Sequence, residues 1–209
     1  MTIFIVIATV LISLVAFSNQ SVMNKLLFSP YRTIHNKEWH RLLTHGFVHA
    51  DYVHLFINMY VLYSFGSAVE SIFKNLQYSG VIQSWILNFS VLYFGGIVIA
   101  SLTTLKKHKD NLYYHSVGAS GAVSAIVFTF IFFAPLSKLL FMFIIPIPAI
   151  VFGILYLAYT HYMSKKGGDY INHDAHFVGS VFGFIYPLLI NPKLITVFLD
   201  AFGIHFSNL

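Results

Sequence analysis

A serine and a histidine, each at the start of a long apolar run, are the residues of this sequence that could do chemistry together. Ser120 stands in Gly-Ala-Ser-Gly (118–121), and His176 stands in Ala-His-Phe-Val-Gly (175–179). A serine hydroxyl is a weak nucleophile and needs an adjacent base to take its proton, which a neutral imidazole can do. The pair therefore predicts acyl transfer, with Ser120 as the nucleophile and His176 as the base.

The second apolar segment carries polar groups that could stabilise the oxyanion of such a reaction. His54 and Asn58 stand four residues apart, so that both project from one face of a helix. At the start of a helix, Ser120 would add a free backbone N–H and the partial positive charge of the helix N-terminus. We expect His54, Asn58 and the Ser120 N–H to form the oxyanion hole, where losing one donor typically costs about 10²–10³ in rate.

Glycines surround both residues and should let the helices that carry them approach closely. Gly118 and Gly121 remove side-chain bulk beside the nucleophile. Gly179 and Gly183 form a Gly-x-x-x-Gly stripe, which permits close packing of two helices. That close packing is expected to bring the serine within hydrogen-bond reach of the histidine.

The composition places these residues in a membrane. The chain is 57% hydrophobic and 9% charged, whereas soluble domains carry about 25% charged residues. Its 209 residues favour a single membrane domain over 1–209. Spanning a bilayer takes about 20 apolar residues, and the expected spans are 2–18, 52–70, 83–103, 118–135, 139–161 and 175–190. The sequence thus predicts an all-α bundle of six transmembrane helices, with the first segment a helix and not a removable signal peptide.

The order of the segments predicts that the polar residues meet at one end of this bundle. The second, fourth and sixth segments carry His54, Ser120 and His176 near their starts. Each of these segments follows an odd-numbered loop, and all odd-numbered loops lie on one side of the membrane. The third and fifth segments are plainer and aromatic-rich, as outer helices tend to be, and Pro146 and Pro148 are expected to bend the fifth.

The remaining segments and the charge balance indicate where the chain meets lipid. Residues 19–51 form a long first loop with an amphipathic stretch beginning at Trp39, which favours the membrane interface, and the tail 192–209 is expected on the surface. The net charge of +5 favours anionic lipid headgroups. It does not form the aromatic-interleaved basic patch that nucleic acid needs. The chain has no cysteine, which excludes disulfides and thiolate chemistry.

At these residues the chain resembles the rhomboid family of intramembrane serine proteases, over nearly its whole length. The matching pieces are Glu38-Trp39-His40-Arg41, His45, His49, His54, Asn58, Gly66 to Glu70, Gly118-Ala119-Ser120-Gly121 and Ala175-His176-x-x-Gly179-x-x-x-Gly183. The resemblance implies a minimal six-helix core and a Ser120–His176 dyad without an acid, in which His54 and Asn58 complete the oxyanion hole.

The resemblance also implies the reaction and its setting. The implied activity is hydrolysis of a peptide bond in or near a transmembrane helix of a membrane-protein substrate, with a small residue at the cut. The implied partners are such substrates and membrane lipids, with no cofactor, no metal and no nucleic acid. The protein would be a multi-pass protein of the cell membrane, with the site open to the extracytoplasmic side.

The chain departs from the family pattern in two respects. Many rhomboids have an aromatic residue four positions after the nucleophile, on which the histidine ring stacks, and here that position is Ser124. The Lys and Arg residues are concentrated in the odd-numbered loops, which by the positive-inside rule would place those loops in the cytoplasm. The family topology places them outside, and we follow the family.

Several other polar residues are interpreted as structural. His45 and His49 are expected to hydrogen-bond the first loop, Arg41 belongs to the loop motif, and Glu70 is expected to cap or pair inside the bundle. Other titratable residues lie close to His176 in sequence. Asp174 stands two residues before it, which on a helix points elsewhere, and so Asp174 is not assigned as a triad acid. His173 is expected in the preceding loop.

Rival functions stay open at this point. The first is a catalytically inactive rhomboid-like protein that binds membrane helices. The second is a metal transporter that uses the histidines at 45, 49, 54 and 176 as ligands. An intramembrane zinc protease would need His-Glu-x-x-His, which this sequence lacks. A serine-directed probe and a zinc analysis would discriminate among these functions.

Overall fold

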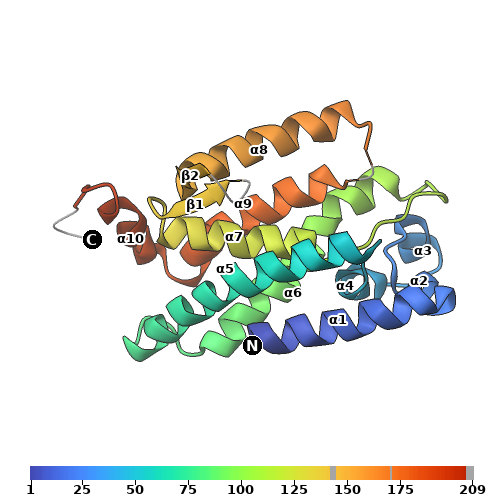
Figure 1. Ribbon diagram of the computed structural model, residues 1–209, viewed down its shortest axis with the longest axis horizontal. Coiled ribbons are helices and arrows are strands. Elements are labelled where there is room, and N and C mark those ends of the chain that lie inside the picture. The colour runs from blue at the N-terminus through green and yellow to red at the C-terminus, as the bar shows by residue number, and fades with distance from the viewer. Residues whose placement is uncertain (142–144, 170, 206–209) are drawn as a thin grey trace.

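The computed structural model describes residues 1–141, 145–169 and 171–205, and within these ranges the chain is mostly helical (Figure 1). The long helices are α1 (Thr2–Ser18), α5 (Tyr52–Tyr78), α6 (Trp85–His108), α7 (Ser120–Phe133), α8 (Ala149–Lys166) and α9 (His173–Ile190). Helices α5 and α6 extend beyond their predicted ends at residues 70 and 103. The shorter elements are α2 (Gln20–Leu26), α3 (Pro30–His35), α4 (Arg41–Thr44), the 3₁₀ turns His45–Phe47 and Pro192–Leu194, and α10 (Ile195–Asp200).

Helix α1 buries small polar side chains and exposes large apolar ones, the opposite of the pattern in a soluble protein. Thr9 and Ser13 are fully buried against the rest of the bundle. In contrast, Phe4 is 73% exposed and Leu11 59% exposed. A helix that buries its small polar residues and exposes its large apolar ones is suited to a lipid solvent, where polar groups need partners inside the bundle.

The length and composition of the helices bear on the predicted count of six spans. Among the described residues, α5 and α6 are both long and apolar enough to cross a membrane. Helix α9 is long and apolar enough to cross a membrane only if it is counted together with Pro192–Asp200, from which it is bent by 116°. Helices α1 and α7 are apolar but have 17 and 14 residues. The six spans therefore remain a prediction.

The predicted fifth segment, 139–161, was wrong at its start. Its first part forms an antiparallel pair of strands, β1 (Lys138–Phe141) and β2 (Ile145–Pro148), with Leu139 opposite Ile147. Pro146 and Pro148 lie in β2 and therefore do not bend the fifth helix as predicted. Proline lacks the N–H that a helix interior needs, so this stretch is unfavourable for a helix. Helix α8 begins only at Ala149, directly after the second proline. The fold is thus helical with a small sheet, and the all-α prediction was incomplete.

The first loop is folded by one buried arginine. Arg41 is 1% exposed, and its Nη1 donates to the carbonyl oxygens of Asn24 at 2.9 Å and Leu27 at 2.7 Å. Its Nε donates to Glu38, which also accepts from Arg32. Burial opposes ionisation of Glu38, but these two cations and their hydrogen bonds hold its pKa below the usual value.

Residues 19–51 are therefore an ordered layer of short helices and not an irregular loop. Trp39 is 53% exposed on this layer, and its location at a membrane interface stays a prediction. At the other end of the chain, the predicted tail 192–209 contains a 3₁₀ turn and α10, and its last four residues lie outside the described ranges.

Helix α7 lies in the middle of the bundle, with α9 packed along it (Figure 1). Residues 121–129 of α7 are all buried. A Cβ on Gly179 would collide with the backbone of Gly121, and one on Gly183 would collide with the backbone of Ala125. These glycines set the distance between the two helices, because only a missing side chain permits backbone contact at that range.

Candidate active site

The chain direction brings three helix N-termini together. Helices α5, α7 and α9 all begin at the end of the bundle where α2, α3 and α4 lie (Figure 1). Side-chain caps fix two of these starts: Asp51 accepts from the His54 N–H at 2.8 Å, and Asn172 accepts from the Ala175 N–H at 3.1 Å. Asp and Asn suit this position because their side-chain oxygens satisfy N–H groups that lack helical partners.

Ser120 and His176 meet at this end. Ser120 is the first residue of α7, and His176 lies in the first turn of α9. The distance from His176 Nε2 to Ser120 Oγ is 2.7 Å. This is hydrogen-bond length for a nucleophile and its base. Both side chains are partly buried.

The turn before Ser120 depends on Gly118. Its φ of +110° lies in a region that side chains rarely adopt. Its N–H donates to the His45 carbonyl at 3.0 Å. A Cβ there would come within 2.7 Å of the His54 ring. A glycine is therefore needed both for the backbone conformation and for the contact with His54.

Of the predicted oxyanion donors, His54 contacts the turn before the nucleophile, and Asn58 lies one helical turn after His54. The His54 ring packs on Gly118, two residues before Ser120. Asn58 is buried and donates one amide hydrogen to the carbonyl of His54 at 3.0 Å, which leaves its second amide hydrogen available. The Val123 N–H closes the first turn of α7 on Ala119. The N–H groups of the preceding residues of that turn therefore have no acceptor within the helix.

His45 and His49 lie where the first loop packs on the bundle, and together they are called the histidine wall. His45 Nδ1–H donates to the Arg41 carbonyl at 2.8 Å, and its Nε2 lies 3.2 Å from Ser101 Oγ of α6. His49 Nδ1 lies 3.0 Å from Ser13 Oγ of α1, whose hydroxyl donates to a backbone carbonyl. These contacts fit the structural role that the sequence suggested for the two histidines.

Protonation of these two histidines is expected to destabilise the fold below neutral pH. Burial lowers the pKa of His45 to about 4, and burial together with the nearby His54 lowers that of His49 to about 3. The unfolded chain, with a histidine pKa near 6.5, binds more protons than the fold between these values, so stability falls as pH falls. From pH 7 to pH 5 the loss should be about 2 kcal/mol for each histidine.

This prediction is checked by thermal unfolding of the detergent-purified protein at the two pH values. The His45→Gln variant should lose part of the pH dependence, and His115→Gln, which changes an exposed histidine, should keep all of it. Equal melting temperatures of the parent at pH 7 and pH 5 would contradict the prediction.

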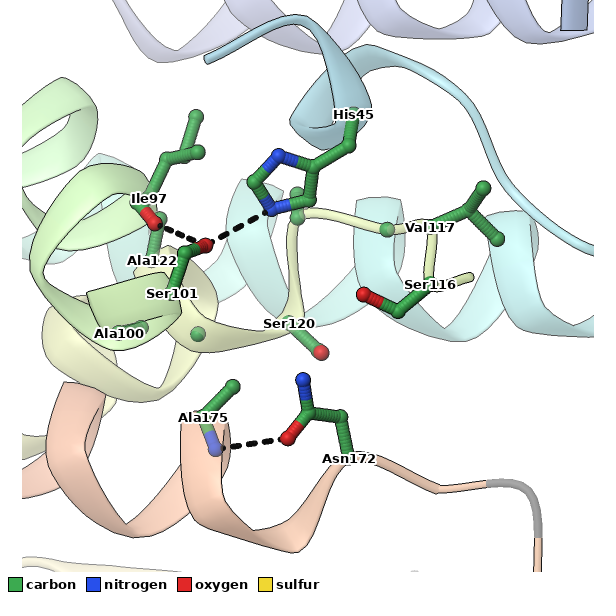
Figure 2. Close-up of a pocket in the computed structure, with 13 residues that line it drawn as sticks. His45, Ile97, Ala100, Ser101, Ser116, Val117, Ser120, Ala122, Asn172 and Ala175 are labelled. Carbon is green, nitrogen blue, oxygen red and sulfur yellow. Dashed lines mark hydrogen bonds between the residues drawn. The ribbon is translucent and has the colours of Figure 1, made fainter. Parts of the chain in front are cut away.

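A small cavity lies directly beside the nucleophile. Its volume is about 20 Å³, which is room for one water molecule. Figure 2 shows the Ser120 hydroxyl at this cavity, together with His45, Ser101, Ser116 and Asn172. These polar groups come from the first loop, from α6 and from the segments before α7 and α9. The cavity therefore lies between Ser120 and His45.

Sequence reasoning missed three groups around the dyad. The first is Tyr156 of α8, whose hydroxyl lies 3.2 Å from both His176 Nδ1 and Ser124 Oγ. The aromatic ring beside the histidine therefore comes from α8, while the expected position, 124, holds a serine. The second is Asn172, which caps α9 and bonds Thr104 of α6. The Asn at an N-cap position could have been found from sequence, but a partner from α8 could not.

The third group is His173, which was expected in the loop but begins α9. It is 4% exposed, and its Nε2 lies 3.0 Å from Asp169. Asp174 points away from the site and pairs with Lys107 of α6 at 3.0 Å. Glu70 accepts from Thr2 of α1 at 2.9 Å and from Lys74 of its own helix at 2.8 Å.

Comparison with known proteins now decides the family. The model of the Rhomboid domain matches residues 36–193 of this chain. The chain belongs to the rhomboid family. The matched range contains both residues of the dyad, the two histidines of the wall and the three helices whose N-termini meet at the site.

This rhomboid chain is similar to part of one curated plant protein. The chain is 30% identical to RHOMBOID-like protein 12, mitochondrial, from Arabidopsis thaliana, over 168 residues. The similar region is 78% of this chain and 50% of the relative. The chain thus spans about half the length of the curated relative that it matches.

Proposed function

We propose that the chain is an intramembrane serine protease, which hydrolyses peptide bonds in or near the transmembrane helices of membrane-protein substrates. The observation that carries the proposal is the 2.7 Å contact between His176 Nε2 and Ser120 Oγ. It occurs in a rhomboid-family chain at a junction of three helix N-termini. The residues in play need no cofactor for this reaction.

The acylation step uses the dyad and the start of α7. His176 Nε2 takes the hydroxyl proton while Ser120 Oγ attacks the scissile carbonyl carbon. The carbonyl oxygen becomes an oxyanion, for which the Ser120 N–H, Asn58 and His54 are the proposed donors. Collapse of this intermediate expels the amine, which takes the proton back from His176, and leaves an acyl ester on Ser120.

The deacylation step requires a water molecule in an otherwise apolar setting. The cavity beside Ser120 has room for one and is lined by polar groups, including His45 and Ser101. His176 removes a proton from the water molecule as the water attacks the ester carbonyl carbon. Collapse of the tetrahedral intermediate then breaks the bond to Ser120 Oγ, which takes the proton back from His176, and releases the carboxylic acid product. His45 thus has a proposed second use, in addition to its structural contacts with Arg41 and Ser101.

We further propose a multi-pass location in the cell membrane, with six spans formed by α1, α5, α6, α7, α8 and α9. The exposed apolar side chains of α1 and the long apolar helices α5 and α6 support a membrane location. The site end of the bundle would open to the extracytoplasmic side. The substrates are membrane proteins with a small residue at the cut, and lipids surround the helices.

The test is labelling of the detergent-purified chain with a fluorophosphonate, which reacts with activated serines. We expect the parent to be labelled and Ser120→Ala to remain unlabelled at the same melting temperature. Ser90→Ala, which changes a serine of α6 whose hydroxyl donates to the Ile86 carbonyl, is the matched control and should be labelled like the parent.

A parent protein that is folded but remains unlabelled would contradict the proposal. That result would favour the rhomboid-like binding protein without activity. The metal-transporter alternative has less support, because three of the four histidines it needs have a ring nitrogen bonded to Arg41, Ser13 or Ser120. Within the described residues, no group of three His, Cys, Asp or Glu side chains could hold a metal ion.

A further inference from the structure

Helix α8 contributes one side chain that reaches the base of the dyad from behind. The Tyr156 hydroxyl lies 3.2 Å from His176 Nδ1, the ring nitrogen that faces away from Ser120. The two rings are nearly parallel, with planes 16° apart and centroids 6.4 Å apart. The base is thus held between a serine from α7 and a phenol from α8.

The direction of these hydrogen bonds follows from the chemistry of the base. To accept the proton of Ser120, His176 must have its lone pair on Nε2, and its own hydrogen is then on Nδ1. The Nδ1–H donates to the Tyr156 oxygen at 3.2 Å. The phenol keeps its own hydrogen and can donate it to Ser124 Oγ, also at 3.2 Å.

Ser124 explains why the phenol lies at this place. It stands one helical turn after Ser120, on the same side of α7, and is 6% exposed. Its small side chain leaves room for an aromatic ring from the neighbouring helix. Its hydroxyl also gives the phenol hydrogen a buried acceptor, and buried polar groups are nearly always paired in this way.

We propose that Tyr156 is a positioning residue for His176, an inference that rests on the proposed protease function. By accepting the Nδ1–H, its hydroxyl holds the imidazole in the tautomer and orientation that the reaction needs, as the acid of a catalytic triad does. When His176 gains a proton, the same hydrogen bond is to a charged donor and becomes stronger. Tyr156 remains neutral and touches neither substrate nor nucleophile.

The test compares Tyr156→Phe with Tyr162→Phe, an exposed tyrosine of the same helix. Phenylalanine keeps the ring beside Phe128 and Phe152, so the fold should hold. The activity is cleavage of a fluorogenic peptide with one transmembrane helix and alanines at the cut. We expect kcat to fall about 10- to 100-fold in Tyr156→Phe with an unchanged KM, and no change in Tyr162→Phe.

A spectroscopic measurement separates positioning from general structural damage. In protein labelled with ¹⁵N-histidine, the Nδ1 resonance of His176, assigned by its absence in His176→Gln, should shift in Tyr156→Phe and not in Tyr162→Phe. Ser124→Ala removes only the acceptor of the phenol hydrogen, and should lower kcat by less than Tyr156→Phe does.

The outcomes are distinguishable. An active parent with Tyr156→Phe at the parent kcat and an unshifted resonance overturns the inference and leaves the protease function standing. A rise in KM at constant kcat also overturns it, since that would indicate a substrate contact. A parent no faster than Ser120→Ala overturns the protease function, and the inference with it.

Discussion

Replacing His176 with alanine is expected to lower the cleavage rate by about 10⁴-fold or more, while the protein stays folded. The imidazole lies 2.7 Å from Ser120 Oγ, and within the described residues no other side chain is bonded to that hydroxyl. Without the base the hydroxyl keeps its proton and is a poor nucleophile. The measurement is the single-turnover rate on the transmembrane peptide, beside a melting curve.

Two further variants make this prediction sharp. His161→Ala removes an exposed histidine of α8 and should cleave at the parent rate. The double variant Ser120→Ala with His176→Ala should be no slower than either single variant, because residues that act as one unit are strongly non-additive. A His176→Ala protein with more than about a tenth of the parent rate would contradict the dyad, since proton transfer contributes about 10²–10⁴-fold.

The second large effect concerns packing. We expect Gly183→Val to prevent α7 and α9 from packing, and so to lower both the melting temperature and the cleavage rate. A Cβ at this position meets backbone atoms of Ala125, and a helix backbone cannot rotate away as a flexible side chain can. Thr129 Oγ1 also donates to the Gly183 carbonyl at 2.7 Å, and this bond would be lost as the helices separate. Overpacking of a core costs about 1–3 kcal/mol or more.

A glycine of α6 provides the matched control. The nearest atom to a Cβ on Gly95 would be Phe182 Cζ at 3.7 Å, an ordinary van der Waals contact. Gly95→Ala should therefore keep the parent melting temperature, whereas Gly183→Ala should already lower it. If Gly183→Ala and Gly95→Ala melted at the same temperature, the close approach of α7 and α9 would not be the feature that holds the dyad together.

Local spacing was enough to select residues that the structure brings together at one end of the bundle. The i, i+4 spacing of His54 and Asn58 and the small residues around Ser120 are properties of a single helix, so that they can be recognised without tertiary contacts. The Gly-x-x-x-Gly stripe likewise predicted a close helix contact, which the structure places between α9 and α7. Counting apolar segments predicted that three helix starts share one end, because helices connected in series alternate in direction.

Other parts of the fold needed information that a single segment does not contain. The stretch 139–148 is as apolar as a helix that crosses a membrane, and only its prolines indicated otherwise. Proline is a weak signal on its own, since it can kink a membrane helix when neighbours satisfy the freed carbonyl. Here the two strands pair with each other and the helix starts after Pro148.

The sequence by itself was enough to indicate a lipid environment, the family motifs and the pair of residues that could react. Composition indicates the environment, and residue types and their spacing indicate the motifs and the pair. Tertiary structure alone decided what holds that pair in place. Tyr156 of α8 contacts His176, which lies 20 residues later in the chain. Arg41 holds the first loop by donating hydrogen bonds to the carbonyls of Asn24 and Leu27. Such contacts depend on how helices pack in three dimensions, and side-chain periodicity along one helix does not specify which neighbour will lie beside it.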